Sequence, residues 1–377
     1  MVNVLFISIA QRFFIILAVL IIVAIIVFCG IYLTRFRTMS TIKKITSYND
    51  GYNLYSMDVK YDYSLDNVIN CGIEDDQTLI NAIIREALPL LPVKINVPSF
   101  GCTAFTLVGN DGCIRMGRNY DFKNDTSSML VYCTPKNGYK SVAFAALDNV
   151  SANVPDENIQ KKLTSLTAPF ICLDGMNEKG VSVAVLTLDS EPTHQKTDKP
   201  TIATTLAIRL VLDKAATTQE AIDLLSQYDM FASSGRDYHF YITDASGDGR
   251  AVEYDCNSKD RKLVVTKTEA LTNFFIFYKD KVKPSQKNGI YGHGRERYDS
   301  VMQILGENKG NYTNDIAWEA LKATAQDPNP NDVTSNTQWS IVYNDTDLSA
   351  EIAIRRNWNN ITNYKLIENQ VEINKEK

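Results

Sequence analysis

The longest run of apolar positions in the chain lies close to its start. Residues 13–33 read FFIILAVLIIVAIIVFCGIYL and contain no charged side chain. As a helix, this run is long enough to cross the roughly 30 Å hydrocarbon core of a bilayer. A cleaved signal peptide has a shorter apolar core, which is followed by a small-residue cleavage site that this sequence does not show. The pattern predicts a single transmembrane anchor within residues 1–37.

Residues 38–101 show a second pattern, with one amphipathic stretch. In EDDQTLINAIIREAL the acidic residues come first, and apolar residues then recur at helical spacing at Leu79, Ile80, Ile83, Ile84, Ala87 and Leu88. Three prolines follow before Gly101 and predict an extended connector. We expect a pro-segment that consists of one helix and a linker.

From Cys102 to residue 377 the pattern changes to short alternating or wholly apolar runs, which are typical of strands. Turn signals such as Asp111-Gly112 separate them. Helical patterns interrupt the runs at residues 204–215, from Thr217 onward, and over RERYDSVMQIL. Strands and helices that do not strictly alternate predict one α+β domain, built in layers with mainly antiparallel sheets.

Composition narrows the range of functions. The 377 residues are 45% hydrophobic and 22% charged, which is ordinary for a globular protein. The net charge is −5 and no long basic block occurs, which argues against nucleic acid as a partner. The seven cysteines include no C-x-x-C pair, and there are only three histidines. We therefore expect neither a metal nor a cofactor.

The stretch CTAFTLVGNDGCIRMGRNYDF begins at Cys102 and is predicted to form a β-hairpin. A two-residue turn at Asp111-Gly112 places Cys102 opposite Asp121, with Arg118 nearer the turn. A bulge would shift this register by one residue. A thiol next to a fixed positive charge has a lowered pKa. From the hairpin alone, a buried cysteine with a surface salt bridge is the simpler explanation.

A nucleophilic Cys102 needs a base, and the hairpin contains no histidine. A cysteine at a chain terminus could use its own α-amine, whose ordinary pKa is about 7.7–8.0. This arrangement is the N-terminal variant of a nucleophile–base pair. It requires cleavage of the chain between Gly101 and Cys102.

The segment from Cys102 to GRNYDF resembles the start of the mature choloylglycine hydrolase family, which includes bile salt hydrolases, penicillin V acylases and the related acid ceramidases. Further segments resemble the family in the same order, namely DGMNEKGVSVAVL, YHFYITDASGDGRAVEY, LTNFF, GRERYDSV and TQWSIVYN. Together they cover nearly all of the chain from Gly101 to about residue 365.

This resemblance implies a four-layer αββα sandwich of the N-terminal nucleophile hydrolase type. It implies hydrolysis of a small-molecule N-acyl amide without a cofactor. By position, it implies catalytic roles for Cys102, Arg118, Asp121, Asn273 and Arg297, with Arg295 as the alternative to Arg297, and it implies roles near the substrate or oxyanion for Asn177 and Thr187.

Two departures from the family pattern matter. Bile salt hydrolases have an asparagine where this chain has Thr187, which weakens both bile salt and penicillin V as substrates. About a hundred residues precede Cys102, as in acid ceramidase-like relatives that cleave themselves at this point.

Three questions stay open at this stage. The scaffold could instead transfer the acyl group to an amine, or serve as an uncleaved, membrane-tethered binding module. The sequence leaves a homo-oligomer open. The excess of Lys and Arg after the anchor favours a cytoplasmic body by the positive-inside rule. The pro-segment and the export of many relatives favour a body outside the cytoplasm, and this is the location that we expect.

Overall fold

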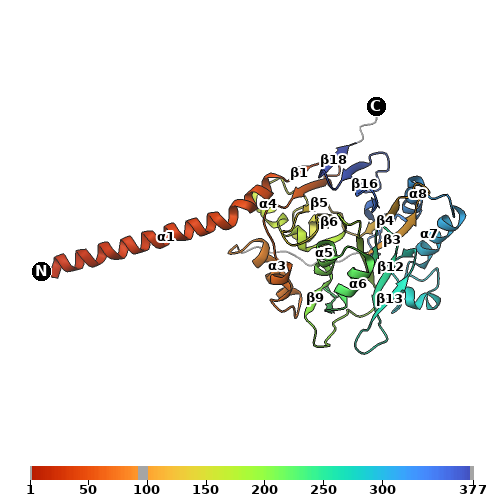
Figure 1. Ribbon diagram of the computed structural model, residues 1–377, viewed down its shortest axis with the longest axis horizontal. Helices are drawn as coiled ribbons and strands as arrows, with labels where there is room; N and C mark the ends of the chain where they lie inside the picture. The colour runs from red at the N-terminus through yellow and green to blue at the C-terminus, as the bar shows by residue number, and fades with distance from the viewer. Residues whose placement is uncertain (1, 92–100, 374–377) are drawn as a thin grey trace.

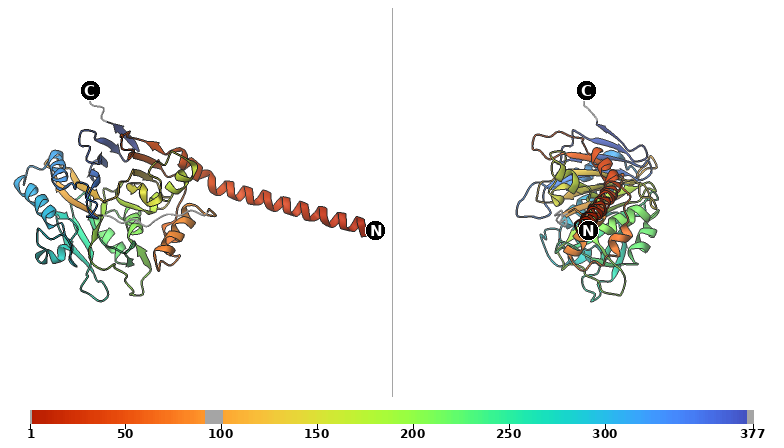
Figure 2. Two further views of the ribbon diagram at one scale, coloured as in Figure 1. Left: turned by 180° about the vertical axis from the view of Figure 1, so that it is seen from behind. Right: turned by 90° about the vertical axis from the view of Figure 1, so that its left-hand side faces the viewer.

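The computed structural model describes the backbone of residues 2–91 and 101–373, and the side chains within these ranges except those of residues 2–10, 101 and 373. Two β-sheets are stacked at the centre of the body, and helices cover their outer faces (Figure 1). One long helix projects from the body, as two further views also show (Figure 2).

The larger sheet has nine strands within the described residues. In spatial order its strands are β1 (Lys43–Lys44), β2 (Leu54–Asp58), β5 (Ser128–Cys133), β6 (Ser141–Ala146), β7 (Cys172–Asn177), β8 (Ser182–Leu188), β11 (Asp237–Thr243), β12 (Arg250–Tyr254) and β13 (Leu263–Lys267). Neighbours are antiparallel, except that β2 and β5 are parallel. Every residue of β5 to β8 and of β11 is buried, including polar residues such as Asp174 and His239.

The smaller sheet carries the predicted hairpin. In spatial order its strands are β14 (Ala270–Leu271), β3 (Gly101–Val108), β4 (Ile114–Asp121), β15 (Thr337–Asn344), β16 (Ser349–Ile354), β17 (Thr362–Lys365) and β18 (Gln370–Ile373), all antiparallel. Contacts of β3 with β8 and β11 join the two sheets. A separate parallel pair consists of β9 (Thr201–Ala203) and β10 (Asp229–Phe231).

The helices form the outer layers. They are α1 (Val2–Ser40), α2 (Leu65–Ile69), α3 (Asp76–Ala87), α4 (Ile159–Ser165), α5 (Thr204–Lys214), α6 (Thr218–Leu225), α7 (Arg295–Glu307) and α8 (Asn314–Thr324), with 3₁₀ turns η1 (Leu147–Val150), η2 (Ala168–Phe170) and η3 (Ile276–Lys281). Helix α5 packs on β7 and β8, whereas α7 and α8 pack on β3 and β4. The predicted α+β layers are confirmed, as are the helices near residues 76, 204, 217 and 295; α8 was not predicted.

The hairpin forms, but the predicted register is wrong by one residue. Cys102 pairs with Tyr120, and Gly101 pairs with Asp121. The turn is a five-residue loop between Val108 and Ile114, closed by a hydrogen bond of 2.8 Å from Gly109 N to Cys113 O. A five-residue loop shifts the pairing because it holds one residue more than the two-residue turn and its flanking pair.

Residues 38–91 are part of the body and not only a linker. Strand β2 adds an edge to the larger sheet by pairing with β5. Two tyrosines that follow it are buried: the Tyr61 hydroxyl donates to Leu166 O at 2.6 Å, and the Tyr63 hydroxyl donates to Asp213 Oδ1 at 3.0 Å. The sequence predicted only a helix and a connector here, because β2 is short and its partner lies far along the chain.

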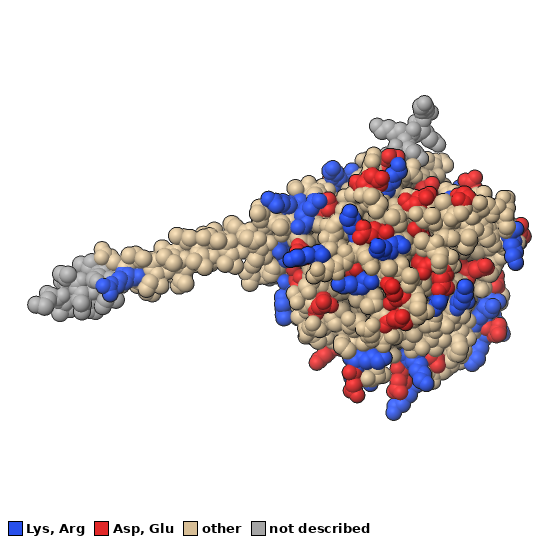
Figure 3. Space-filling view, viewed as in Figure 1, with Lys and Arg blue, Asp and Glu red and all other residues tan. Residues whose placement is uncertain are grey.

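Helix α1 has the length and composition of a membrane span over Gln11–Ser40, features that a signal sequence near the N-terminus also shows. Its described surface carries almost no charge along the projecting part (Figure 3). At its base, Arg35 donates to Ala87 O at 2.6 Å and to Glu86 O at 2.7 Å. These carbonyls belong to the last turn of α3, where a cation is favourable. The projecting helix is thereby fixed to the body.

We expect a chain that starts at Cys102 to lose cooperative folding, whereas a chain that starts at residue 31 keeps it. The shorter chain lacks several buried large side chains of residues 39–88. Each such loss costs about 2–5 kcal/mol, against a typical total stability of about 5–15 kcal/mol. Calorimetry of both chains measures the effect. Equal unfolding midpoints for the two would contradict the structural role of residues 38–91.

Candidate active site

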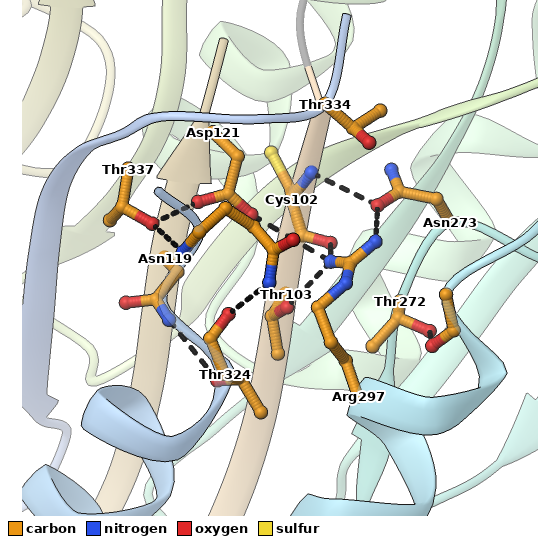
Figure 4. A network of polar contacts seen from close by, with 12 residues as sticks. Cys102, Thr103, Asn119, Asp121, Thr272, Asn273, Arg297, Thr324, Thr334 and Thr337 are labelled. Carbon is orange, nitrogen blue, oxygen red and sulfur yellow. Dashed lines mark hydrogen bonds and ion pairs between the residues drawn. The ribbon is translucent and has the colours of Figure 1, made fainter. Parts of the chain in front are cut away.

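Cys102 is the second residue of β3 and is fully buried. Its strand lies between β14 and β4, so that residues following β14 and residues on β4 surround it. The Cys102 backbone nitrogen donates to Asn273 Oδ1 at 3.3 Å (Figure 4). Burial raises the pKa of the Cys102 thiol to about 12, although the nearby Arg118 charge lowers it. In the continuous chain only a small fraction of this thiol is therefore ionised at neutral pH.

Arg118 reaches from β4 across to the larger sheet. Its Nε donates to Asp174 Oδ2 at 3.2 Å and its Nη2 to Val185 O at 2.8 Å. Both charged side chains are completely buried. Its third nitrogen, Nη1, is buried with no hydrogen-bond partner among the described residues. The guanidinium therefore holds one unused donor group in the core, at a position from which its charge acts on Cys102.

Asp174 holds the other side of this ion pair. Besides Arg118, its carboxylate accepts hydrogen bonds from the Tyr343 hydroxyl and from Trp339 Nε1 at 3.1 Å. Burial raises the pKa of Asp174, and the Arg118 charge opposes that shift. The sequence analysis did not select Asp174, although a carboxylate inside an apolar strand is itself a signal of a buried partner.

Asp121 is at the end of β4 and is fully buried. Its Oδ1 accepts from the Thr337 hydroxyl at 2.6 Å. Its Oδ2 has no hydrogen-bond partner among the described residues and lies 3.7 Å from Arg297 Nη1. Burial raises the pKa of this carboxyl, and Arg297 lowers it in opposition. One carboxylate oxygen beside Cys102 thus remains able to accept a hydrogen bond.

Arg297, near the start of α7, joins these groups (Figure 4). Its Nη1 donates to Cys102 O and to the Thr103 hydroxyl, both at 2.9 Å, and its Nη2 donates to Asn273 Oδ1 at 2.7 Å. Gly294 makes room for it: a Cβ at that residue would lie 2.4 Å from Arg297 Nη2, and its φ is +80°.

The alternative to Arg297 lies elsewhere. Arg295 donates to Asp299 Oδ1 at 2.7 Å and to Lys279 O at 2.8 Å, on the outer part of α7. The structure therefore brings Arg297, and not Arg295, to Cys102. Because the two arginines are only two residues apart, the sequence did not distinguish them.

Asn273 follows β14 and is fully buried. Its Oδ1 accepts from Arg297 and from the Cys102 nitrogen, and its Nδ2 donates to Thr187 O at 2.9 Å. A side-chain amide carries two N–H groups, so one donor remains available after the bond to Thr187.

Two predicted residues have other tasks. The Thr187 hydroxyl donates to Asp237 O at 3.3 Å and accepts from Arg236 Nε at 3.0 Å, so its proton is used and only its carbonyl serves the site, through Asn273. Asn177 donates to Leu212 O and Ala215 O at the end of α5. The structure thus gives Asn177 a role in holding a helix, not one beside Cys102.

Within the described residues, no group of three or more His, Cys, Asp and Glu side chains is placed to hold a metal ion. What the buried cluster can do chemically follows from its charges. Two arginines and two carboxylates surround one thiol, and among the described residues the groups without full hydrogen bonding are Asp121 Oδ2, Arg118 Nη1 and Asn273 Nδ2. Such a site can hold a proton acceptor beside a sulfur and stabilise negative charge on a substrate oxygen.

Comparison with known proteins identifies the family. The family described as acyl-coenzyme A:6-aminopenicillanic acid acyl-transferase matches residues 108–359. The chain belongs to this family. A search of curated proteins found no match to the chain.

Solved structures of other proteins have a similar fold. Penicillin V acylase from Agrobacterium tumefaciens has a TM-score of 0.52 and 18% identity, covering 71% of this chain and 87% of that one. A mutant of conjugated bile acid hydrolase from Clostridium perfringens has a TM-score of 0.53 and 16% identity, covering 73% and 97%. The N-terminal nucleophile hydrolase fold and the resemblance to choloylglycine hydrolases are confirmed.

In chains that still span the Gly101–Cys102 junction, we expect alkylation of Cys102 to be slow at neutral pH. With a thiol pKa of about 12, the reactive thiolate fraction rises about tenfold for each pH unit below that value. Replacing Arg118 with Gln removes the charge that lowers this pKa, so the rate falls further at every pH. Mass spectrometry of peptides after timed alkylation measures it.

Cys133 provides the internal control, because it is also fully buried and burial raises the pKa of its thiol to about 11. Arg118→Gln leaves the Cys133 rate unchanged if the fold is intact. Equal slowing at both cysteines, or none at Cys102, would contradict an electrostatic action of Arg118 on this thiol.

Proposed function

We propose that the protein hydrolyses a linear amide of a small N-acyl compound, with Cys102 as an N-terminal nucleophile exposed by cleavage at Gly101–Cys102. The observation that carries this proposal is the surroundings of the Cys102 nitrogen. It donates to Asn273 Oδ1 at 3.3 Å, and the buried Asp121, one carboxylate oxygen of which has no hydrogen-bond partner among the described residues, lies on the neighbouring strand β4 on the other side of Cys102 (Figure 4). Both groups are acceptors, and a free α-amine offers them more donors than a peptide N–H does.

Cleavage changes the chemistry of the thiol. The released α-amine, with an ordinary pKa of about 7.7–8.0, takes the proton of the Cys102 thiol. Arg118 stabilises the thiolate that forms. Asp121 orients the amine through its unused oxygen.

The thiolate then adds to the acyl carbonyl carbon of the substrate, and the carbonyl oxygen gains a negative charge. In this proposal the second N–H of Asn273 donates to this oxygen, and losing such a donor typically costs roughly 10²–10³ in rate. Arg297 holds Asn273 Oδ1 and thereby keeps the amide nitrogen turned toward the reaction.

The protonated α-amine gives its proton to the leaving nitrogen as the C–N bond breaks, which leaves an acyl thioester on Cys102. Water adds to the thioester, with the amine again as base, and the carboxylic acid leaves. The thiol and the amine return to their starting states, so protons and electrons balance without a cofactor.

Transfer of the acyl group to an amine, in place of water, is the second candidate. One finding favours it: the matching family is described by an acyl-transferase activity. Both reactions share the acyl thioester and differ only in the acceptor. Adding a primary amine to the assay distinguishes them, because a transferase releases a new amide.

We propose that α1 anchors the protein in a membrane, with the body outside the cytoplasm. The uncharged run of 13–33 supports the anchor. The exposed Cys71 offers a test of the side. A membrane-impermeant thiol reagent on intact cells is expected to label Cys71, with Cys71→Ala as the control. Labelling that needs permeabilised cells would place the body in the cytoplasm.

The proposed reaction predicts two losses in Cys102→Ala. The variant should stay uncut at Gly101–Cys102 and should lose activity on a panel of N-acyl amides by on the order of 10³-fold or more, because the nucleophile is absent. Cys113→Ala is the matched control, since Cys113 lies in the hairpin loop away from the buried cluster.

Mass spectrometry of the purified chains and release of free amine from the panel measure the two effects. A wild-type chain that remains intact and inactive on every amide would refute the enzyme and favour an uncleaved binding module. Activity in an uncut wild-type chain would contradict the proposal that cleavage at Gly101–Cys102 is required for catalysis.

A further inference from the structure

A buried histidine and glutamate lie beneath the segment that carries Asn273. His239 is on β11 and Glu253 is on the neighbouring strand β12, and both are completely buried. His239 Nδ1 is 3.0 Å from Glu253 Oε1. An ionisable pair in the core is costly unless hydrogen bonds satisfy both members. The position of those further bonds indicates what the pair does.

All the further bonds go to one short segment of backbone. His239 Nε2 is 2.9 Å from Thr272 O, directly before Asn273. The Glu253 carboxylate accepts from Ile276 N at 2.8 Å and from Phe277 N at 3.1 Å, at the start of η3. The pair thus holds the chain on both sides of Asn273, from strands of the larger sheet.

The partners satisfy the polar atoms of both side chains. A carbonyl oxygen only accepts, so the proton between His239 and Thr272 is on Nε2. One further proton is shared between His239 Nδ1 and Glu253 Oε1, and two backbone N–H groups donate to Glu253. Both ring nitrogens and both carboxyl oxygens therefore have hydrogen-bond partners.

The other side of the segment is closed as well. His293 N donates to Asn273 O at 2.8 Å, and a Cβ on Gly292 would lie only 2.1 Å from that oxygen. Asn273 itself contacts Cys102, Arg297 and Thr187 through its side chain. Little movement is therefore possible while the His239–Glu253 pair is in place.

We propose that His239 and Glu253 are positioning residues that fix Asn273, and through it the Cys102 nitrogen, in the reactive arrangement. This inference rests on the proposed function, in which Asn273 donates a hydrogen bond to the substrate oxygen that gains negative charge. A displacement of about 1 Å at a reacting group can cost about 10²-fold in rate, even when the change lies far from the chemistry. His239, which the sequence alone suggests is merely structural, then acts on the turnover rate.

The test compares two histidines that each bond a backbone carbonyl. His239→Leu removes the donor to Thr272, whereas His194→Leu removes a contact with Ala232 O directly after β10. We expect His239→Leu to lower kcat by about 10–100-fold with KM changed less than about twofold. We expect His194→Leu to leave both unchanged. His239→Gln can still donate to Thr272 O and should recover part of kcat.

Each variant is measured as the full-length chain, on whichever N-acyl amide the wild type hydrolyses. Hydrogen exchange of the backbone amides of residues 271–277 is measured in parallel, and His239→Leu should speed it relative to His194→Leu. If His239→Leu does not fold, Glu253→Gln replaces it, because it keeps the shape and one acceptor while it removes the charge.

Wild-type kcat in His239→Leu, or a loss no larger than in His194→Leu, would overturn the positioning role. Unchanged exchange at residues 271–277 would overturn it too. A wild type that is inactive on every amide defeats the proposed function instead, and the exchange rates then still decide whether the pair holds this segment.

Discussion

The ion pair between Arg118 and Asp174 connects the two sheets inside the core. Each partner comes from a different sheet, and neither is exposed to solvent. Such a pair stabilises little by itself, because desolvation offsets most of the attraction, but breaking it leaves an isolated buried charge. It therefore restricts which arrangements of the sheets are allowed. Hydrogen bonds from Tyr343 and Trp339 to the Asp174 carboxylate offset part of the free energy that desolvation of this pair costs.

The position of Cys102 follows from that constraint. Arg118 is directed into the space between the sheets, and the open end of β3 lies beside it. The same space receives Asp121 from the end of β4 and Arg297 from α7. Groups that are far apart in the sequence therefore meet at one strand terminus, where a short loop and a glycine at residue 294 leave room for them.

The sequence predicted the layers and several of the residues that the structure gathers around Cys102, and the reasons differ from residue to residue. Cys102, Arg118 and Asp121 are local to one hairpin, so a turn signal and the family resemblance were sufficient. Asn273 and Arg297 came from the resemblance alone. The predicted register of the hairpin was wrong because the length of the turn depends on hydrogen bonds that the Asp111-Gly112 dipeptide alone does not indicate. Asn177 was assigned from a motif and Thr187 by counting along it, whereas the structure directs the Asn177 side chain to the end of α5 and the Thr187 hydroxyl to Arg236 and Asp237.

The part of the fold before Cys102 could not be predicted for a different reason. Strand β2 has only five residues, and it is parallel to β5, which begins seventy residues later. Parallel pairing of this kind has no local signal. Its consequence is that cutting the chain at Gly101–Cys102 would not separate the two parts, since β2, Tyr61 and Tyr63 remain enclosed by the body.

The charges of the buried cluster also bear on how a released α-amine would behave. In the continuous chain, the two arginines and two carboxylates balance, with a neutral thiol between them. A protonated amine adds a positive charge to a dry site that already contains Arg118 and Arg297. Burial and these charges favour the neutral amine, which is the form that accepts a proton, whereas Asp121 favours the ammonium form. A base needs this opposition, because an amine held permanently protonated could not receive the thiol proton. The unused oxygen of Asp121 can thus orient the amine by accepting a hydrogen bond from it. Because the Asp121 charge is also paired with Arg297, it stabilises the ammonium form too weakly to keep the amine protonated.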